Sequence, residues 1–392
     1  MTTEVARRGD PFALSADERQ VRDTVRTWAQ AELAPSAAQR DEDERYDRGL
    51  FERAAELGLA GLTCPEEYGG AGMGSFAWAL AIEEVAAAEM AMAVSLSVHV
   101  LAQLPILTFG TDAQKLRFLP PMAAGRELGA FALTEPQAGS DAAALSLAAV
   151  RDGDDYRLSG TKIWITNGGD AWIFVVFATV DRSRGKDGIT AFVVERETEG
   201  FRLGTKERKM GIRATTGYEL VFEEARVPAE NRLGDEGQGL KVALAALGAG
   251  RISIAAACVG LARGALEHAG HYALQRTQFG RPIGDQELIQ GMLAEMAVAV
   301  EASRLLTWRA ARMRDAGEQV ASASSMAKWH ASDVAMRVTT DAVQIYGGAG
   351  YSRDNPVERL MRDAKGAQIY EGTNQIHRLI VAQHLLDELR RR

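Results

Sequence analysis

The stretch Trp172-Ile173-Phe174-Val175-Val176-Phe177-Ala178-Thr179-Val180 decides the fold class of this chain. It is a short run of aromatic and β-branched residues, a composition typical of a β-strand. Similar short runs occur at 156–158, 161–166, 189–194 and 218–222, separated by turn residues such as Ser159-Gly160 and Asn167-Gly168-Gly169. Consecutive runs have no helical segment between them. The pattern therefore predicts an antiparallel β domain, a small barrel or sandwich, and argues against a doubly wound parallel sheet.

Helical patterns flank this β segment on both sides. Upstream, Ser15 and Glu18 have the spacing of a capping box, and apolar residues then recur at helical spacing. Downstream, we expect long helices at 240–275, 286–316, 320–346 and 374–390, with Pro356 among the residues that punctuate them. Four long helices with short connections indicate a bundle. The expected fold class is α+β, with an N-terminal α-helical domain at 1–128, a middle β domain at 129–238 and a C-terminal four-helix bundle at 239–392.

Composition narrows the class of protein. The chain has 392 residues, of which 46% are hydrophobic and 25% charged, which is ordinary for a globular protein of two or three domains. The net charge of -8 is spread along the chain and argues against binding to nucleic acid. Two cysteines, Cys64 and Cys258, form no metal or CxxC pattern and indicate a reducing compartment. Residues 1–10 contain no apolar run of a signal peptide, so we expect a cytoplasmic protein. We expect no metal site, because His268 and His271 share a helix face without a third ligand.

The longest stretch without Asp, Glu, Lys or Arg covers residues 90–111. It contains His99, Gln103 and Pro105, which a membrane span rarely combines. A buried helix that ends at Pro105 is the better interpretation, because proline interrupts the helical hydrogen-bond ladder. We therefore expect no membrane span.

Glu371 is a carboxylate with no cation within four residues on either side, in Ala367-Gln368-Ile369-Tyr370-Glu371-Gly372-Thr373-Asn374-Gln375-Ile376. Its neighbours are aromatic, small and amide residues, which suggests a partly apolar pocket. Burial raises a carboxylate's pKa, and a raised pKa suits a general base. The alternative interpretation is an exposed acid that caps the following helix.

Four other segments have side chains that suit a cofactor. Residues 131–141 offer hydroxyl and glycine amides that can hold phosphate or ring carbonyl oxygens, and 162–168 place Trp164 and Thr166 on one strand face, suited to a planar ring. Residues 276–280 suit a pyrophosphate with a ring, and the glycines of 344–351 allow a close backbone approach. Each segment also has a structural interpretation: a loop into a domain, a core tryptophan, a helix C-terminus and a helix stop.

Together these segments resemble the acyl-CoA dehydrogenase flavoprotein family. The strings that carry the resemblance are Ala132-Leu133-Thr134-Glu135-Pro136, Ala138-Gly139-Ser140-Asp141, Lys162-Ile163-Trp164-Ile165-Thr166-Asn167-Gly168, Arg276 with Gln278-Phe279-Gly280, Gln344 with Gly347-Gly348, residues 356–365, and Tyr370-Glu371-Gly372-Thr373. They follow the family's order and cover the chain after residue 12. The resemblance implies the acyl-CoA dehydrogenase fold.

The resemblance implies FAD as cofactor, held by residues of two subunits. Within one subunit, the flavin and its phosphates would be lined by Phe131, Leu133, Thr134, Gly139 and Ser140. Trp164 would cover one flavin face with Ile165 and Thr166 beside it, and the adenine half would contact Thr373 and Gln375. The FAD of a neighbouring subunit would be reached by Arg276, Gln278, Phe279, Gln344, Gly347 and Gly348. Such sharing implies a homo-oligomer, in this family usually a tetramer.

The resemblance also implies a reaction, the α,β-dehydrogenation of fatty acid β-oxidation. Glu371 matches the base that removes an α-proton from a short-, medium- or branched-chain acyl-CoA, giving a trans-2-enoyl thioester, with electron-transfer flavoprotein as acceptor. The implied substrate contacts are Ser140, Arg251, Tyr370 and Gly372, with residues 91–101 as the pocket floor. Some relatives place the base immediately before an arginine that corresponds to Arg251. That position is Gly250 here, so Glu371 has no competitor.

Two positions depart from the family pattern. Gly248 stands where an aspartate often contacts CoA, and Glu287 stands where a glutamine is expected near the flavin phosphates. Gly248 leaves room for a tailoring dehydrogenase or flavin oxidase that acts on a group bound to acyl-carrier protein. A nitroalkane oxidase would have Asp in place of Glu371. A non-catalytic flavin- or acyl-CoA-binding paralogue is the remaining alternative, and Glu371 argues against it.

Overall fold

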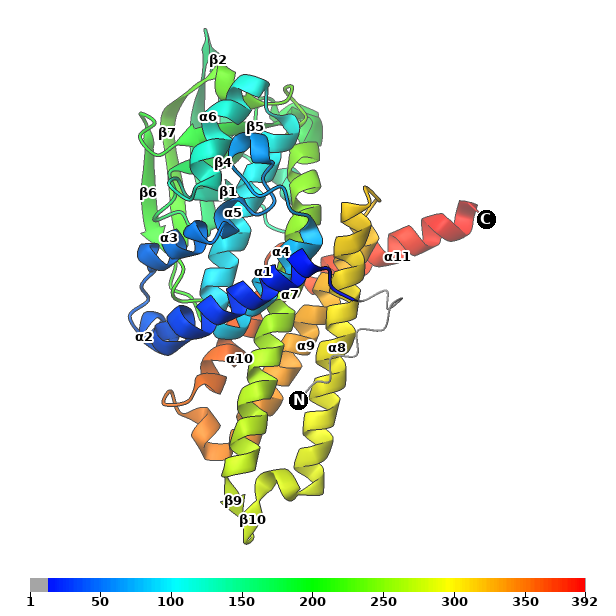
Figure 1. The fold of residues 1–392 in the computed structure, drawn as a ribbon. Helices are drawn as coiled ribbons and strands as arrows, with labels where there is room; N and C mark the ends of the chain where they lie inside the picture. Colours follow the sequence, from blue (N-terminus) through cyan, green and yellow to red (C-terminus); the bar gives the residue numbers. More distant parts are fainter. Residues whose placement is uncertain (1–12, 392) are drawn as a thin grey trace.

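A helical segment, a β segment and a second helical segment follow one another along the chain, in the order that the sequence predicts (Figure 1). The computed structural model describes residues 13–391. Residues 1–10, on which the expectation of no signal peptide rests, lie outside the described residues.

The first segment comprises α1 (Ala16–Trp28), α2 (Ala37–Glu42), α3 (Arg48–Glu56), α4 (Ser75–Ala88), α5 (Met90–Phe109) and α6 (Asp112–Ala123). The predicted capping box is confirmed: Glu18 N donates to Ser15 Oγ at 3.2 Å, and Ser15 N donates to Glu18 Oε2 at 2.8 Å. The predicted end of a helix at Pro105 is wrong, since α5 continues to Phe109. Packing of α5 against α4, α6, α7 and β1 outweighs the one hydrogen bond that proline removes.

The middle segment is a sheet of β1 (Gly129–Ala132), β2 (Ala148–Asp152), β3 (Asp155–Ile165), β4 (Ile173–Thr179), β5 (Ile189–Glu195), β6 (Phe201–Lys206), β7 (Tyr218–Pro228) and β8 (Arg232–Leu233). The strand order is β6-β7-β3-β2-β4-β5-β8, with β1 on β4. The expectation of a purely antiparallel sheet is wrong at β4, which pairs in parallel with β1 and β2. Parallel pairs need connections longer than a hairpin, and residues 133–172 supply one between β1 and β4. The turn predicted at Ser159-Gly160 is instead an irregularity within β3.

Strand β4 lies between two apolar clusters, which explains its uninterrupted apolar sequence. Phe174 and Val176 face the interior of the β segment, with residues of β3, β5 and β7. Val175 and Phe177 point the other way, against residues of α5, α6 and α7. All seven residues of β4 are buried. The helical layer is thus fixed directly on the sheet.

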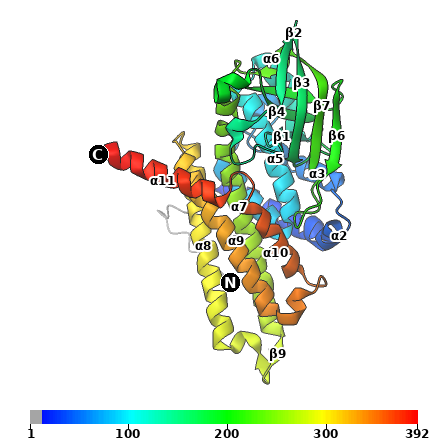
Figure 2. The same cartoon turned by 180° about the vertical axis from the view of Figure 1, so that it is seen from behind.

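The last segment comprises α7 (Gly239–Gln275), α8 (Glu287–Asp315), α9 (Ala321–Tyr346), α10 (Pro356–Ala367) and α11 (Asn374–Arg391). The four predicted long helices are present, with bounds within two residues of the expected ones. Helices α7, α8 and α9 pack along one another, whereas α11 leaves the body of the protein and projects outward (Figures 1 and 2). Helix α10, where the sequence indicated only a break, packs against α7 and α9.

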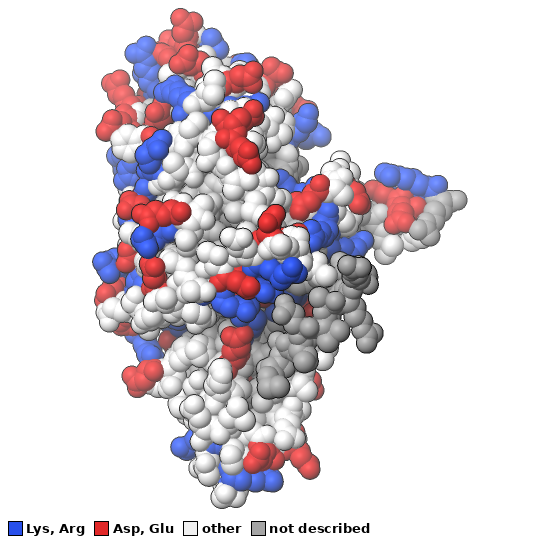
Figure 3. All heavy atoms as spheres, in the orientation of Figure 1, with Lys and Arg blue, Asp and Glu red and all other residues white. Residues whose placement is uncertain are grey.

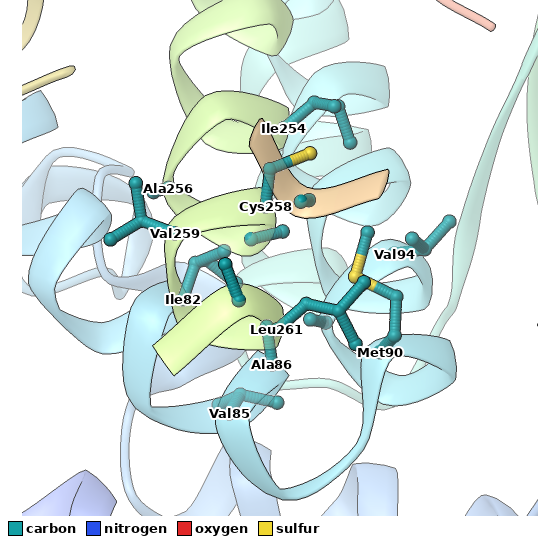
Figure 4. Packing of buried hydrophobic residues seen from close by; sticks show 14 of the residues in the cluster. Ile82, Val85, Ala86, Met90, Val94, Ile254, Ala256, Cys258, Val259 and Leu261 are labelled. Carbon is teal, nitrogen blue, oxygen red and sulfur yellow. The ribbon is translucent and has the colours of Figure 1, made fainter. Parts of the chain in front are cut away.

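The main core joins the two helical segments. Figure 4 shows Ile82 and Val85 of α4 and Met90 of α5 near Val259 and Leu261 of α7. The most apolar windows of α5 and α7 are long enough to cross a membrane, but 83% and 72% of them are buried inside the protein, as in core helices. On the face drawn in Figure 3, acidic and basic side chains are interspersed without a large area of one sign.

Candidate active site

Glu371 lies in a turn between α10 and α11 with an unusual backbone. Its φ of 53° is in the left-handed region, and Gly372 follows with φ 92°. A non-glycine residue in this region costs about 1–2 kcal/mol. The carboxylate atom Oε2 is buried and has no hydrogen-bond partner, so the alternative of an exposed capping acid is wrong. Strained backbone and an unpaired buried carboxylate oxygen make Glu371 a candidate functional residue.

The environment of Glu371 changes its proton affinity as the sequence predicts. Burial raises the pKa of the carboxyl to about 7, while the nearby charges of Lys328 and Arg251 oppose this shift. Arg251 is itself buried, its Nε has no partner, and burial lowers its pKa. At neutral pH the site therefore holds a carboxylate poised between its charged and neutral forms, as a general base requires.

The Glu371 carboxylate occupies the space that a side chain at Gly250 of α7 would otherwise fill. A Cβ on residue 250 would lie 2.5 Å from Glu371 Oε2, closer than any real contact. Only glycine lets the carboxylate rest against the helix. Position 250, where the resemblance places the base of some relatives, is thus the position against which the Glu371 carboxylate lies.

Helix α9 holds the Glu371 turn through residues that sequence reasoning did not identify. Lys328 is fully buried, and its Nζ donates to Gly372 O at 2.7 Å and to Asn374 Oδ1 at 3.1 Å. Asn374 Nδ2 in turn donates to Asp333 Oδ1 at 2.7 Å. The available signal was a lysine at a core-facing position, with Ala327 and Ala331 beside it in the helical pattern.

A small cavity is lined in part by Gly250. Its volume is about 40 Å³, and its lining residues are Thr63, Ser75, Trp78, Ser97, Val100, Leu101, Leu104, Ala249, Gly250, Ile252, Ser253 and Arg314. Three of these come from the predicted floor at 91–101. Trp78 Nε1 donates to Ser253 Oγ at 2.9 Å, and Ser253 Oγ donates to Ser97 Oγ at 2.7 Å. This chain of bonds fixes the cavity wall by joining α4, α7 and α5.

Trp164 stands at the end of β3 as an exposed aromatic surface. It is 56% exposed with φ 59°, so the core-tryptophan alternative is wrong. Thr166 is half-buried, but the Ile165 side chain packs in the β core and leaves only its main chain for a ligand. The predicted loop adjoins this strand, because Ile163 N donates to Thr134 O at 3.0 Å.

The loop residues differ in accessibility. Phe131 and Leu133 are half-buried against the helical layer, Thr134 is half-buried, and Gly139 and Ser140 are exposed. Glu135 anchors the loop through a fully buried ion pair with Lys162, at 2.7 Å. An exposed aromatic plane, an open glycine loop and the unpaired hydroxyl of Tyr370 fit a planar cofactor with polar substituents.

The residues expected to serve a neighbouring subunit lie at the opposite end of α7 from the sheet (Figures 1 and 2). Arg276 follows α7, and Gln278 and Phe279 form the exposed β9–β10 hairpin (Thr277–Gln278 and Arg281–Pro282), with Phe279 94% exposed. Gln344, Gly347 and Gly348 at the end of α9 are exposed as well. The two groups are neighbours, because Tyr272 of α7 stacks on Tyr346 of α9 with ring centroids 4.0 Å apart.

Four further positions were singled out from the sequence: Thr373, Gln375, Gly248 and Glu287. Thr373 is half-buried beside Glu371, and Gln375 is exposed on the first turn of α11. Gly248 has no neighbour within 4 Å of an added Cβ, and Glu287 is exposed at the start of α8. Among residues 13–391 no three His, Cys, Asp or Glu side chains are grouped as metal ligands would be.

Three domain families match the chain in sequence: acyl-CoA dehydrogenase N-terminal domain at 15–126, middle domain at 130–225 and C-terminal domain at 237–386. An acyl-CoA dehydrogenase of Bacillus subtilis is 47% identical over 374 residues, which are 95% of this chain and 99% of that protein. Among solved structures, butyryl-CoA dehydrogenase from Megasphaera elsdenii is 44% identical with TM-score 0.94, covering 96% of this chain and 100% of that one.

A chain from a structure described as the electron transferring flavoprotein of Acidaminococcus fermentans is 46% identical with TM-score 0.95, and covers 96% of this chain and 100% of that one. These similarities extend over nearly the whole chain and confirm the fold class and the resemblance. The chain belongs to the acyl-CoA dehydrogenase family of FAD-dependent oxidoreductases.

Proposed function

We propose that this protein dehydrogenates a short-chain acyl-CoA to the trans-2-enoyl-CoA with FAD as cofactor, and that Glu371 is its base. The observation that carries the proposal is the buried oxygen Oε2 of the Glu371 carboxylate, which has no hydrogen-bond partner and lies against Gly250. Its raised pKa of about 7 suits removal of a proton from a weak carbon acid. A scaffold without turnover has no need of such a residue.

The residues of the chain have the following proposed roles in the reaction. The main-chain N–H of Glu371 donates to the thioester carbonyl and acidifies the α-carbon. The Glu371 carboxylate removes the α-proton, and Arg251 and Lys328 stabilise its charged form. Trp164 would cover the cofactor ring, and the residues that would line it are Phe131, Leu133, Thr134, Gly139, Ser140 and Thr166. The bound FAD would supply the acceptor for the hydride that leaves the β-carbon.

The size of the cavity beside Gly250 supports a short acyl chain. A water needs roughly 10–15 Å³ of such space, so about 40 Å³ has room for only a few heavy atoms. The Trp78–Ser253–Ser97 bonds make its wall costly to displace. The similarity to a butyryl-CoA dehydrogenase agrees with this size.

A panel of substrates tests the function. Anaerobic addition of acyl-CoAs from C3 to C16, with isobutyryl and isovaleryl forms, should bleach the flavin fastest near C4. A butyryl group on acyl-carrier protein is the matched comparison, because Gly248 offers no side chain to CoA. Bleaching by the carrier-bound group alone would replace CoA with the carrier protein in this proposal. A flavin that no acyl thioester bleaches would refute it.

The pH dependence follows from the pKa of Glu371. The base acts in its charged form, which dominates above its pKa of about 7. We therefore expect kcat/KM to fall tenfold per pH unit below that value and to level off above it, because kcat/KM reports the free enzyme. Steady-state assays with an artificial electron acceptor give the profile. A rate that stays constant from about pH 6 to pH 8 would contradict the assignment.

We also propose a homo-oligomer, in keeping with a tetramer, in which each cofactor site is completed by a second copy. Arg276 follows α7 and Gly347 follows α9, and the ends of these two helices are joined by the stacked rings of Tyr272 and Tyr346. Figure 2 shows this end of α7, beside β9, at the opposite end of the molecule from the sheet. Helix α11 also projects from the body with exposed Leu379, Leu385 and Leu386, a surface that a second copy would cover.

Hybrid oligomers test this sharing. Arg276→Ala and Trp164→Ala should each abolish most activity alone. Hybrids isolated with two affinity tags should regain about half of the wild-type activity, because one site per pair combines intact Trp164 with intact Arg276. The double variant Trp164→Ala/Arg276→Ala mixed with itself is the control. Hybrids as inactive as their parents would place both residues in the same site.

The remaining proposals concern the electron acceptor, the location in the cell and the domain bounds. We propose electron-transfer flavoprotein as the acceptor, supported by the similarity to a chain from such a structure. A cytoplasmic location is supported by two free, buried cysteines, Cys64 and Cys258. The division into domains at 1–128, 129–238 and 239–392 is supported by the loops between α6 and β1 and between β8 and α7.

A further inference from the structure

Lys328 is a fully buried lysine in the middle of α9 that no predicted role accounts for. Burial lowers its pKa to about 8, so the ammonium is still charged at neutral pH. Burying a lysine is costly unless its hydrogen bonds and charge are compensated. The hydrogen-bond partners of Lys328 therefore indicate its role.

The hydrogen-bond partners of Lys328 are the turn that carries Glu371 and the first residue of α11, which follows it. The Nζ atom donates to Gly372 O at 2.7 Å, the carbonyl of the residue directly after the base, and to Asn374 Oδ1 at 3.1 Å. Glu371 and Gly372 both have positive φ. Such a conformation persists only where the surroundings fix it. The bond to Gly372 fixes the peptide next to the Glu371 side chain.

The same helix binds the turn at both flanks. Gln368 Nε2 donates to Asp333 Oδ1 at 2.6 Å, and Asn374 Nδ2 donates to the same atom at 2.7 Å. Ser332 Oγ also donates to Asn374 Oδ1 at 3.1 Å. Lys328 and Ser332, four residues apart, lie on one face of the helix, and Asp333 is the next residue round from Ser332. Three residues of α9 therefore hold residues 368–374.

The charges around the carboxylate come from three helices and the turn. Among the charges that lower the pKa of Glu371, Lys328 of α9 has the largest effect and Arg251 of α7 the next. The titratable groups near Lys328 are Cys258 of α7, Glu371, Arg251 and Asp333. His377 of α11 has its pKa lowered to about 3 and stays neutral. Tyr370 has its pKa raised well above 10 and stays neutral too.

We propose that Lys328 is a positioning residue for Glu371, which holds the turn of the base against α9 and places a positive charge beside the carboxylate. This inference rests on the proposed role of Glu371 as the base. A purely structural lysine would support the fold and leave the proton affinity of Glu371 unchanged.

The titration of Glu371 separates these roles. Infrared difference spectra of the holoenzyme without substrate give its midpoint, identified by the band that Glu371→Gln removes. Lys328→Met should raise the midpoint by roughly one pH unit or more, because an opposite charge nearby is lost, and lower kcat more than it changes KM. Lys328→Gln should show the same shift with a smaller loss of kcat, since its amide still donates to the turn.

Lys209→Met is the matched control. Lys209 is half-buried, with a pKa also lowered to about 8 by burial, but its Nζ donates to Thr215 Oγ1 at 2.8 Å and not to the turn. It should leave the Glu371 midpoint unchanged. A wild-type midpoint in both Lys328 variants would overturn the inference, as would a failure of both to fold. Full activity of Glu371→Gln would instead overturn the base assignment.

Discussion

Replacing Glu371 by Gln should lower the rate of flavin bleaching by about 10³–10⁴-fold, because general-base catalysis contributes up to that factor. The amide has the size of the carboxyl and no basic oxygen. It keeps the turn and the fit against Gly250, where a Cβ would lie 2.5 Å from Oε2. Stopped-flow absorbance with butyryl-CoA measures the rate, and the flavin spectrum before mixing shows whether FAD is retained.

Gly250→Ala is the companion to this experiment. The added Cβ would displace the carboxylate without altering its chemistry, so the rate should fall while the pH profile keeps its shape. A Glu371→Gln enzyme that bleaches as fast as wild type would show that another group takes the proton. Equal rates in Gly250→Ala and wild type would show that the carboxylate does not act from its place against α7.

Replacing Lys162 by Met should lower the free energy of unfolding by about 3–5 kcal/mol, because it leaves the buried charge of Glu135 unpaired. Both side chains are fully buried, at 0% and 1% exposure, and 2.7 Å apart. Glu135 keeps the N–H bonds from Ser146 and Leu147, which points to the lower end of this range. Urea denaturation measures the change. FAD affinity should fall as well, since Lys162 Nζ also donates to Leu133 O.

The exposed pair between Arg202 and Glu223 is the control, at 56% and 63% exposure. Water and salt screen this pair, so Arg202→Met should leave the urea midpoint unchanged. The expectation fails if Lys162→Met has the midpoint of Arg202→Met. That result would mean that solvent reaches Glu135 once the lysine is gone.

Local sequence patterns were sufficient for most elements of the fold. Periodicity and turn residues located the long helices and the main strands, and the Ser15–Glu18 box is present as predicted. Two kinds of feature could not be predicted from local sequence patterns. The parallel pairing of β1 with β4 depends on where a long connection returns, which strand composition does not encode. Helix α10 begins at Pro356, which looked like a break, although proline is well suited to the first turn of a helix.

The site was predictable to the extent that its residues form short strings. Glu371, Trp164 and the glycine loops could be identified in this way, through a family resemblance. Lys328 could not, because its partners Gly372 and Asn374 lie more than forty residues further along the chain. A lysine within a helix is ordinarily read as solvent-exposed. Only the folded structure shows that Lys328 Nζ donates to the carbonyl of Gly372, the residue after Glu371.

The unbroken helix α7 also determines which insertions and deletions the protein can tolerate. Gly250, against which the Glu371 carboxylate lies, and Arg276, proposed to serve a neighbour's cofactor, are joined by uninterrupted helix up to Gln275 and lie about 40 Å apart. A one-residue deletion between them would rotate one end by about 100° relative to the other. Substitutions elsewhere on this helix leave its length unchanged, whereas insertions and deletions are expected only in the loops beyond its ends.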